Sequence, residues 1–292
     1  MAVAEAFIPS PTRRGTARLG GARRAIGRVS IAEKVGLALL AVLVLAALFA
    51  PLLAPYNPIT PSGLPFQAPF TGGHLMGTDE VGFDIFSRVL YGLRTSVVGA
   101  VVVVASGVVI GGLIGLVAGV TGGWLDTVLM RFTDLFLALP GPVLAIAFVA
   151  ALGPSEFHTL LAVAIVWWPF YARIMRGEIR ALAARPHLEA ARLAGAGVTR
   201  RAVRHLLPGA VPAIVVTASL DVGNLVLTLA GLSFLGLGAP APAPELGAMA
   251  ARGLQYLLQD WWVPVMPAIA VFLLTLASNL SGDGLNDLMS KS

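Results

Sequence analysis

The chain lacks cysteine, and this absence excludes disulfide bonds, a thiolate nucleophile and any cysteine-ligated metal or iron–sulfur site. Charged residues are scarce as well, at 12% of the 292 residues, whereas a soluble domain carries about 25%. The two lysines, Lys34 and Lys291, lie outside any G-x-x-x-x-G-K-S/T sequence, so the chain encodes no P-loop for ATP. Its four histidines form no H-E-x-x-H pair, which leaves a zinc hydrolase without ligands. We therefore expect no enzyme and no cofactor or metal site in this chain.

Apolar residues are abundant: they form 57% of the chain, and its mean hydropathy is +0.84. A soluble core cannot absorb so much apolar surface, but a bilayer can, provided that each membrane span is about 20 residues long. Apolar runs bounded by glycine, proline or charge predict six transmembrane helices, at 35–55, 95–120, 128–152, 158–178, 209–237 and 263–282. The expected fold is an all-α integral membrane protein.

Lysine and arginine positions predict the orientation, because basic residues near span ends stay on the cytoplasmic side. Of the 20 basic residues, seven precede the first expected span: Arg13, Arg14, Arg18, Arg23, Arg24, Arg28 and Lys34. Eight more lie at or beyond the end of the fourth span: Arg173, Arg176, Arg180, Arg185, Arg192, Arg200, Arg201 and Arg204. Six spans place both groups on one side, so both termini should be cytoplasmic. This clustering explains the net charge of +5 without a nucleic-acid partner.

The same pattern divides the chain into segments. Residues 1–34 form a basic cytoplasmic tail, and 35–55 are expected to be a retained first transmembrane helix rather than a cleaved signal. Residues 56–94 form an external loop whose second half, from Asp79 to Arg94, is expected to be a short amphipathic helix. Residues 95–285 are the core with five further spans. A second external loop, 238–262, contains an amphipathic piece that would serve as a lid or lie at the membrane surface.

Two features of the second and third spans are interpreted as structural. A ridge of glycines at every fourth residue lets a neighbouring helix approach closely: Gly107, Gly111, Gly115 and Gly119. Near the inner end of the third span, Arg131 lies within five positions of Asp126 and Asp134, which predicts local charge compensation.

The fifth span carries a polar stripe at steps of four, three and four residues: Thr217, Asp221, Asn224 and Thr228. An intramembrane aspartate is costly and normally faces a bundle interior, a partner or a water-filled path. The stripe is our candidate lining of a translocation pathway. A hydrogen-bonded seam between helices, without solute contact, is the alternative.

Between the fourth and fifth spans the segment from Pro186 to Pro212 reads PHLEAARLAGAGVTRRAVRHLLPGAVP. A short helix, a glycine turn at Gly195 and Gly197, and a basic helix ending at Leu207-Pro208 predict a protruding elbow. Small alanines would let it dock in a groove of a partner protein. On spacing alone, a solvated basic loop that only sets topology explains the segment equally well.

The spacing Glu189-Ala190-Ala191, then Gly195, then Leu207-Pro208, resembles the cytoplasmic loop of bacterial ABC importer permeases. His205, in place of the aliphatic residue of the general pattern, is similar to the dipeptide, oligopeptide and nickel branch. Three further segments resemble that branch: Met76-Gly-Thr-Asp-Glu-Val-Gly-Phe-Asp-Ile-Phe-Ser-Arg, Leu232-Ser-Phe-Leu-Gly-Leu-Gly and Gly282-Asp-Gly-Leu-Asn-Asp. The resemblance covers about residues 30–290 and is to the C-type permease subunit. Departures are Phe83 and Asn286, where arginine is common, and Leu229, where many relatives carry an acid.

The resemblance implies a type I ABC importer permease in the cytoplasmic membrane. It implies pairing with a homologous permease, two ATPase subunits or domains that bind ATP and Mg²⁺, and an external solute-binding protein. The residues assigned to an ATPase-coupling loop at 183–208 are Glu189, Ala190, Ala191, Gly195, Gly197, Arg201, His205, Leu207 and Pro208. Peptides are the expected solute, with nickel or another metal chelate or haem as the alternative. An ion-coupled secondary transporter and a non-transporting scaffold or receptor are rival classes, discriminated by ATP dependence and by co-purifying subunits.

Overall fold

The structure, a computed structural model, describes residues 30–290, so the basic tail before Ser30 lies outside the described residues. Within that range the chain is helical, with isolated β-bridges in the first external loop and no longer strand. The elements in chain order are α2 (Ile31–Leu48), α3 (Ala50–Leu53), α4 (Ile85–Thr121), α5 (Gly123–Leu137), α6 (Gly141–Leu152), α7 (Glu156–Ala183), α8 (Pro186–Leu193), α9 (Val198–Arg201), the π turn η1 (Ala202–Leu206), α10 (Leu207–Phe234), α11 (Leu246–Gly253), the 3-10 turn η2 (Leu254–Tyr256) and α12 (Trp262–Ser290).

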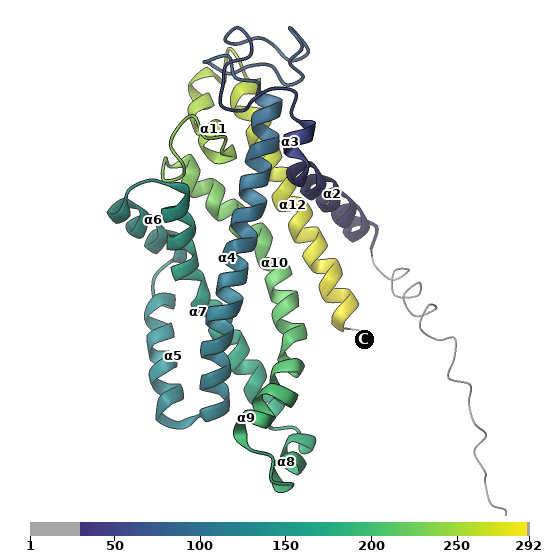
Figure 1. Cartoon of the computed structure of the whole chain (residues 1–292), viewed down its shortest axis with the longest axis vertical. Helices are drawn as coiled ribbons and strands as arrows, with labels where there is room; N and C mark the ends of the chain where they lie inside the picture. The colour runs from purple at the N-terminus through teal and green to yellow at the C-terminus, as the bar shows by residue number, and fades with distance from the viewer. Residues whose placement is uncertain (1–29, 291–292) are drawn as a thin grey trace, which may run out of the picture.

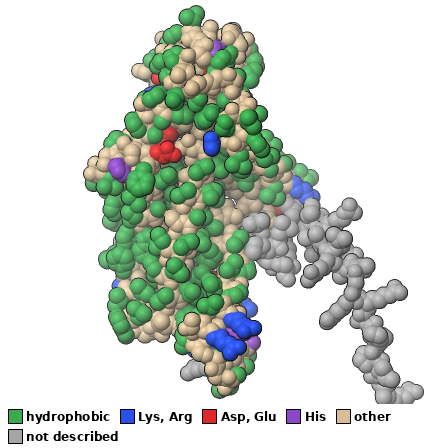
Figure 2. All heavy atoms as spheres, in the orientation of Figure 1, with side chains coloured by type: hydrophobic (Ala, Val, Ile, Leu, Met, Phe, Trp, Pro, Cys, Tyr) green, Lys and Arg blue, Asp and Glu red, His purple; other side chains and the backbone are tan. Residues whose placement is uncertain are grey.

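Five helical stretches of the described range are long and apolar enough to cross a membrane: α2, α4, α7, the continuous α9–η1–α10 rod, and α12. They run along the long axis of the molecule, with the first external loop and α11 at one end and α8 and α9 at the other (Figure 1). Hydrophobic side chains cover the middle of the surface, and basic and histidine side chains gather over α8 and α9 (Figure 2). This distribution matches a bilayer-embedded body with a basic cytoplasmic end.

The third expected span, 128–152, is a bent pair of helices. The helices α5 and α6 meet at 81°, so the run 128–152 is not one straight helix. The break falls at Leu139 and Pro140, because a residue before proline avoids the helical region and proline has no N–H to donate. Hydropathy detected the apolar run but not this corner.

The expected amphipathic helix before the second span is not a separate element. Asp84 caps α4 by accepting a hydrogen bond from the Ser87 backbone N–H at 2.7 Å, and the helix then continues without a break to Thr121. The preceding loop folds back on this helix start. His74 Nδ1 and Asp84 Oδ1 are 2.8 Å apart and buried, and the Arg88 guanidinium donates to the Pro58 carbonyl at 2.9 Å. The loop therefore forms a compact outer cap joined to the top of α4.

The glycine ridge of α4 packs against α7, the most extensive helix pair in the described structure. A Cβ at Gly111 would lie 2.2 Å from the Trp168 carbonyl oxygen, and one at Gly115 would lie 2.3 Å from the Ala172 carbonyl oxygen. Real Cβ atoms do not come so close, so only glycine allows the two backbones this approach. The interpretation of the ridge as tight helix packing is confirmed.

Candidate functional site: the inner elbow, the membrane polar cluster and the outer cavity

The segment between α7 and α10 forms an elbow at the inner end of the molecule, as its sequence predicts (Figure 1). Its first arm, α8, is anchored by Leu188, which is buried in a cluster with Leu182 at the end of α7 and Leu206 before α10. This cluster also contains Met175, Ile179, Ala210 and Ile214. The elbow is therefore packed against the two membrane helices that it connects.

Gly195 ends α8 in a left-handed conformation, with φ +81°. The Ala196 N–H donates to the Ala191 carbonyl at 3.0 Å, a hydrogen bond typical of a glycine-terminated helix. Gly197 is extended, with φ −63°, and occupies the N-cap position of α9. The two glycines thus differ, because only the conformation of Gly195 disfavours other residues.

The second arm differs from the prediction. The basic helix does not end at Leu207-Pro208; instead α9 passes through the π turn η1 into α10, so that residues 198–234 form one rod. Pro208 cannot donate to the carbonyl of Arg204, and its ring would collide with that group in a regular helix. A wider π turn immediately before it is a way to keep the helix going past such a residue.

The exposed face of the elbow carries most of the residues assigned to the coupling loop. Exposed members are Glu189, Ala190, Gly195, Gly197, His205 and Pro208, whereas Ala191, Arg201 and Leu207 are half-buried. Sequence reasoning missed Leu193, which is 85% exposed at the tip of the elbow. The elbow therefore exposes an apolar side chain on the same short segment as the small residues Ala190 and Gly195 and the carboxylate of Glu189. Such a surface is suited to docking in a groove of another protein. The signal was present in the sequence as a leucine at the end of a polar helix.

The polar stripe of α10 is centred on Asp221, which is buried against α7. Its carboxylate accepts hydrogen bonds from the Trp167 indole N–H at 2.5 Å and from the Tyr171 hydroxyl at 3.0 Å. The structure therefore brings Asp221 into contact with two α7 side chains that the sequence did not connect with it. Such a cluster provides the hydrogen bonds that an intramembrane carboxylate requires.

The two threonines of the stripe form hydrogen bonds within their own helix rather than with this cluster. Thr217 and Thr228 donate to the carbonyls of Ala213 and Asn224 on the same helix, at 2.9 and 2.8 Å. The Asn224 side chain is exposed. The pathway role of the stripe stays a prediction, because hydrogen bonding within and between helices accounts for the polar contacts described.

The variants Asp221→Ala and Trp167→Phe separate a pathway from a seam. Removing the carboxylate leaves both α7 donors without their acceptor and should lower stability by about 1–2 kcal/mol. A pathway residue should in addition lower solute uptake per assembled complex, which Trp167→Phe should not do, because it removes only one donor. Uptake and thermal unfolding of the purified complexes measure the two effects. Normal uptake by assembled Asp221→Ala complexes would exclude the pathway role.

The expected pairing of Arg131 with neighbouring aspartates is wrong. Asp126 instead binds two arginines of α7, about 50 residues along the chain: Arg176 through Nε at 2.5 Å and a second nitrogen at 2.9 Å, and Arg180. Asp134 pairs with Arg173 of the same helix at 2.5 Å. The prediction assumed that each aspartate pairs with an arginine close to it in the sequence. Because α5 lies alongside α7, the arginines of α7 are the ones that contact the aspartates.

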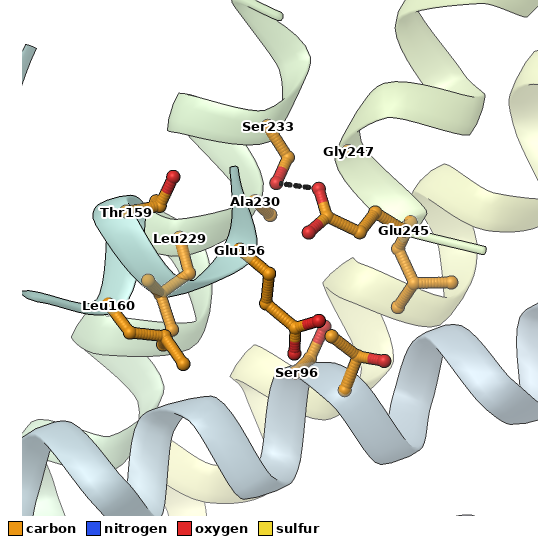
Figure 3. Close-up of a pocket in the computed structure, with 11 residues that line it drawn as sticks. Ser96, Glu156, Thr159, Leu160, Leu229, Ala230, Ser233, Glu245 and Gly247 are labelled. Atoms are coloured by element: carbon orange, nitrogen blue, oxygen red, sulfur yellow. Dashed lines mark hydrogen bonds between the residues drawn. The ribbon is translucent and has the colours of Figure 1, made fainter. Parts of the chain in front are cut away.

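An outer cavity lies between α4, α7, α10 and α11, at the end of the molecule opposite the elbow. It is a small, partly open pocket, and it is lined by Thr95, Ser96, Glu156, Thr159, Leu160, Leu229, Ala230, Ser233, Glu245, Leu246 and Gly247. Figure 3 shows Glu156 extending from α7 toward Ser96, and Glu245 bonded to Ser233. The Ser233 hydroxyl donates to Glu245 at 2.5 Å, and the Ala239 N–H donates to its other oxygen at 3.0 Å. Sequence reasoning missed this cavity, because its residues come from four separate segments.

These features define a class of protein. A bundle of membrane helices with a small, basic, packed elbow between two of them is the architecture of a type I ABC importer permease. One similar solved structure is that of the MetNI methionine ABC transporter in an inward facing conformation. The match has a TM-score of 0.52 at 22% identity and covers 69% of this chain and 97% of that chain. At this identity the likeness establishes the fold, and it confirms the expected fold class.

The chain belongs to the family of binding-protein-dependent transport system inner membrane components, whose model matches residues 111–292. A second model, the N-terminal transmembrane domain of oligopeptide transport permease C, matches residues 34–69. The expected family and the expected location, a multi-pass protein of the bacterial cytoplasmic membrane, are thereby confirmed.

Three curated relatives show how much of the chain the similarity spans. The Probable D,D-dipeptide transport system permease protein DdpC of Escherichia coli (strain K12) is 41% identical over 86% of this chain and 84% of its own length. The di/tripeptide transport system permease protein DppC of Pseudomonas aeruginosa (strain UCBPP-PA14) is 39% identical over 86% and 85%. The glutathione transport system permease protein GsiD of Pectobacterium atrosepticum is 43% identical over 74% and 72%.

Proposed function

We propose that this chain is one of two permease subunits of an importer that carries dipeptides or oligopeptides into the cell. The observation that carries the proposal is the similarity to permeases named for dipeptides and for di- and tripeptides along about 86% of the chain. A relative named for glutathione, itself a short peptide, supports the same solute class. These names favour peptides over a nickel chelate or haem.

Transport proceeds by alternating access, with the energy supplied by separate ATPase subunits that bind ATP and Mg²⁺. Closure of the ATPase pair on ATP pushes the elbow, and the attached helices α7 and α10 tilt so that the path opens outward and then inward. Only the different affinity of ATP for the two states can drive this cycle. The packing of Leu188 against both helices supports this role, because a push on α8 reaches α7 and α10 without a flexible linker.

The complete assembly contains a homologous second permease, two ATPase subunits or domains and an external solute-binding protein. The two ends of the molecule suit these partners differently. The inner end offers the exposed small residues and Leu193 of the elbow to an ATPase groove. The outer end carries the compact cap, with the small pocket near Glu245 at the same end.

Transport by the reconstituted complex tests this function. The chain is co-expressed with the products of its neighbouring reading frames, purified and placed in vesicles with ATP enclosed on the ATPase side. Labelled dipeptide supplied with the binding protein should accumulate only with hydrolysable ATP, and a nickel chelate should not. Uptake that persists without ATP and follows an ion gradient would overturn the proposal in favour of a secondary transporter.

A further inference from the structure

The helix α5 has few apolar anchors to the rest of the described structure. Only Asp126 and Thr133 of its residues are buried, while its large apolar side chains are mostly exposed, Trp124 and Leu135 among them. Phe132 and Phe136 contact the Trp168 ring, with ring centroids 5.9 and 5.5 Å apart. Near the inner end of α5, charged groups also attach it to α7.

Asp126 forms this charged attachment. It is 4% exposed, and its two oxygens bind Arg176, in a forked arrangement, and Arg180. A carboxylate that meets a guanidinium by two parallel hydrogen bonds is held in direction as well as distance. Near a membrane, unpairing these groups is costly, so the contact resists separation of the two helices.

The backbone connections at the two ends of α5 do not fix its orientation relative to the neighbouring helices. At its start Gly122 and Gly123 adopt φ +64° and +61°, and a Cβ at either would meet nothing within 4 Å. At its end the chain turns by 81° into α6. Both joints are corners rather than continuous helix, so side-chain contacts fix how α5 lies against its neighbours.

Each charged partner of α5 lies on α7, the helix whose inner end continues into α8. Arg180 and Arg176 stand about one and two turns, respectively, before Ala183, where α7 ends at the elbow. A displacement of α8 that moves α7 would move α5 through this contact. These arginines belong to α7, which also packs against the glycine ridge of α4. Both α4 and α5 therefore contact α7 through specific groups.

We propose that Asp126 is a positioning residue of the transport cycle, which binds Arg176 and Arg180 so that α5 moves with α7 when the ATPase displaces the elbow. The proposal rests on the proposed coupling of this permease to a separate ATPase. Asp126 touches no solute in this role. Asp126 acts through its contact with α7. When its carboxylate is replaced by a neutral group, ATP hydrolysis should continue, but α5 should no longer move together with α7.

The test uses the complete complex in vesicles with Asp126→Asn, Asp126→Glu and Asp134→Asn. Asparagine keeps the shape of the side chain but loses the charge, and we expect uptake per ATP hydrolysed to fall about tenfold. Glutamate keeps the carboxylate and should restore most of the coupling. Asp134→Asn is the matched control, because it breaks an exposed pair between the same helices and such pairs contribute little.

A second readout does not depend on the solute. This chain has no cysteine, so Thr127→Cys on α5 and Gly177→Cys on α7, both exposed, give two positions for spin labels that are unique within it, and the partner subunits are used in cysteine-free form. The label distance should stay constant between nucleotide-free and ATP-bound wild-type complexes, and it should broaden or change in Asp126→Asn. A complex in which peptide uptake fails altogether would overturn the proposed solute, but this distance would still report on Asp126.

Three results would overturn the positioning role. One is normal uptake per ATP in Asp126→Asn. Another is a proportional loss of uptake and hydrolysis with an unchanged label distance, which indicates a general loss of folded protein. If Asp126→Asn does not assemble, Arg180→Gln removes one of the two partners and should lower uptake per ATP by about threefold. Wild-type coupling in that variant would then refute the proposal.

Discussion

Substitution of Gly111 by alanine is expected to reduce the amount of folded permease in the membrane sharply, whereas the same change at the adjacent Gly112 should be harmless. A Cβ at Gly111 would lie 2.2 Å from the Trp168 carbonyl oxygen, a backbone atom that cannot rotate away. At Gly112 the nearest atom is the Met175 methyl at 3.5 Å, an ordinary contact. Forcing α4 and α7 apart should cost about 3 kcal/mol or more.

Membrane yield and thermal unfolding of the solubilised complex measure this difference. Alanine is the better helix former by about 1 kcal/mol, so Gly112→Ala should be neutral or slightly stabilising. The pair is a matched control, because the two variants differ only in which face of α4 receives the methyl group. Equal stability of the two variants would show that α4 and α7 do not pack as described.

Replacing Gly195 by valine is expected to abolish most ATP-driven uptake while the protein remains inserted and folded. The residue adopts φ +81°, which a β-branched side chain accommodates only with strain of about 1–3 kcal/mol. Space is not limiting, since a Cβ there would meet nothing within 4 Å. The strain should therefore reshape the end of α8 and displace the exposed surface that is proposed to meet the ATPase.

The readouts are uptake, ATP hydrolysis and the amount of ATPase that co-purifies with the permease. We expect uptake to fall by about tenfold or more, since the cost is about 1–3 kcal/mol at the docking surface. The control is Gly197→Ala in the same turn, where φ is −63° and alanine fits without strain. Full coupling in Gly195→Val would contradict the role of the elbow in docking.

Long apolar runs made the membrane helices predictable, because a bilayer demands about 20 consecutive apolar residues and the run itself is the signal. Corners were harder to predict. The bend near Pro140 and the continuous passage through Pro208 involve the same residue type with opposite outcomes, and the neighbouring packing decides between them. The merging of the amphipathic segment with α4 likewise depends on Asp84, which caps the helix at a point that hydropathy does not mark.

The candidate site was predicted in part for a related reason. The elbow is a local feature, so a glycine turn and its flanking helices could be identified from adjacent residues. The partners of Asp126 and Asp221 lie about 50 residues away on α7. Their contacts depend on which helices face each other, and one sequence without an alignment contains little information on that. The outer cavity, assembled from four segments, was beyond prediction for the same reason.

The unbroken rod from Val198 to Phe234 has a mechanical consequence. At 1.5 Å per residue its 37 residues extend for about 55 Å, from the elbow to the wall of the outer cavity at Ser233. A tilt of about 5° at one end of such a lever shifts the other end by about 5 Å. A small change of angle at the elbow would therefore move the outer end of α10 by several ångströms.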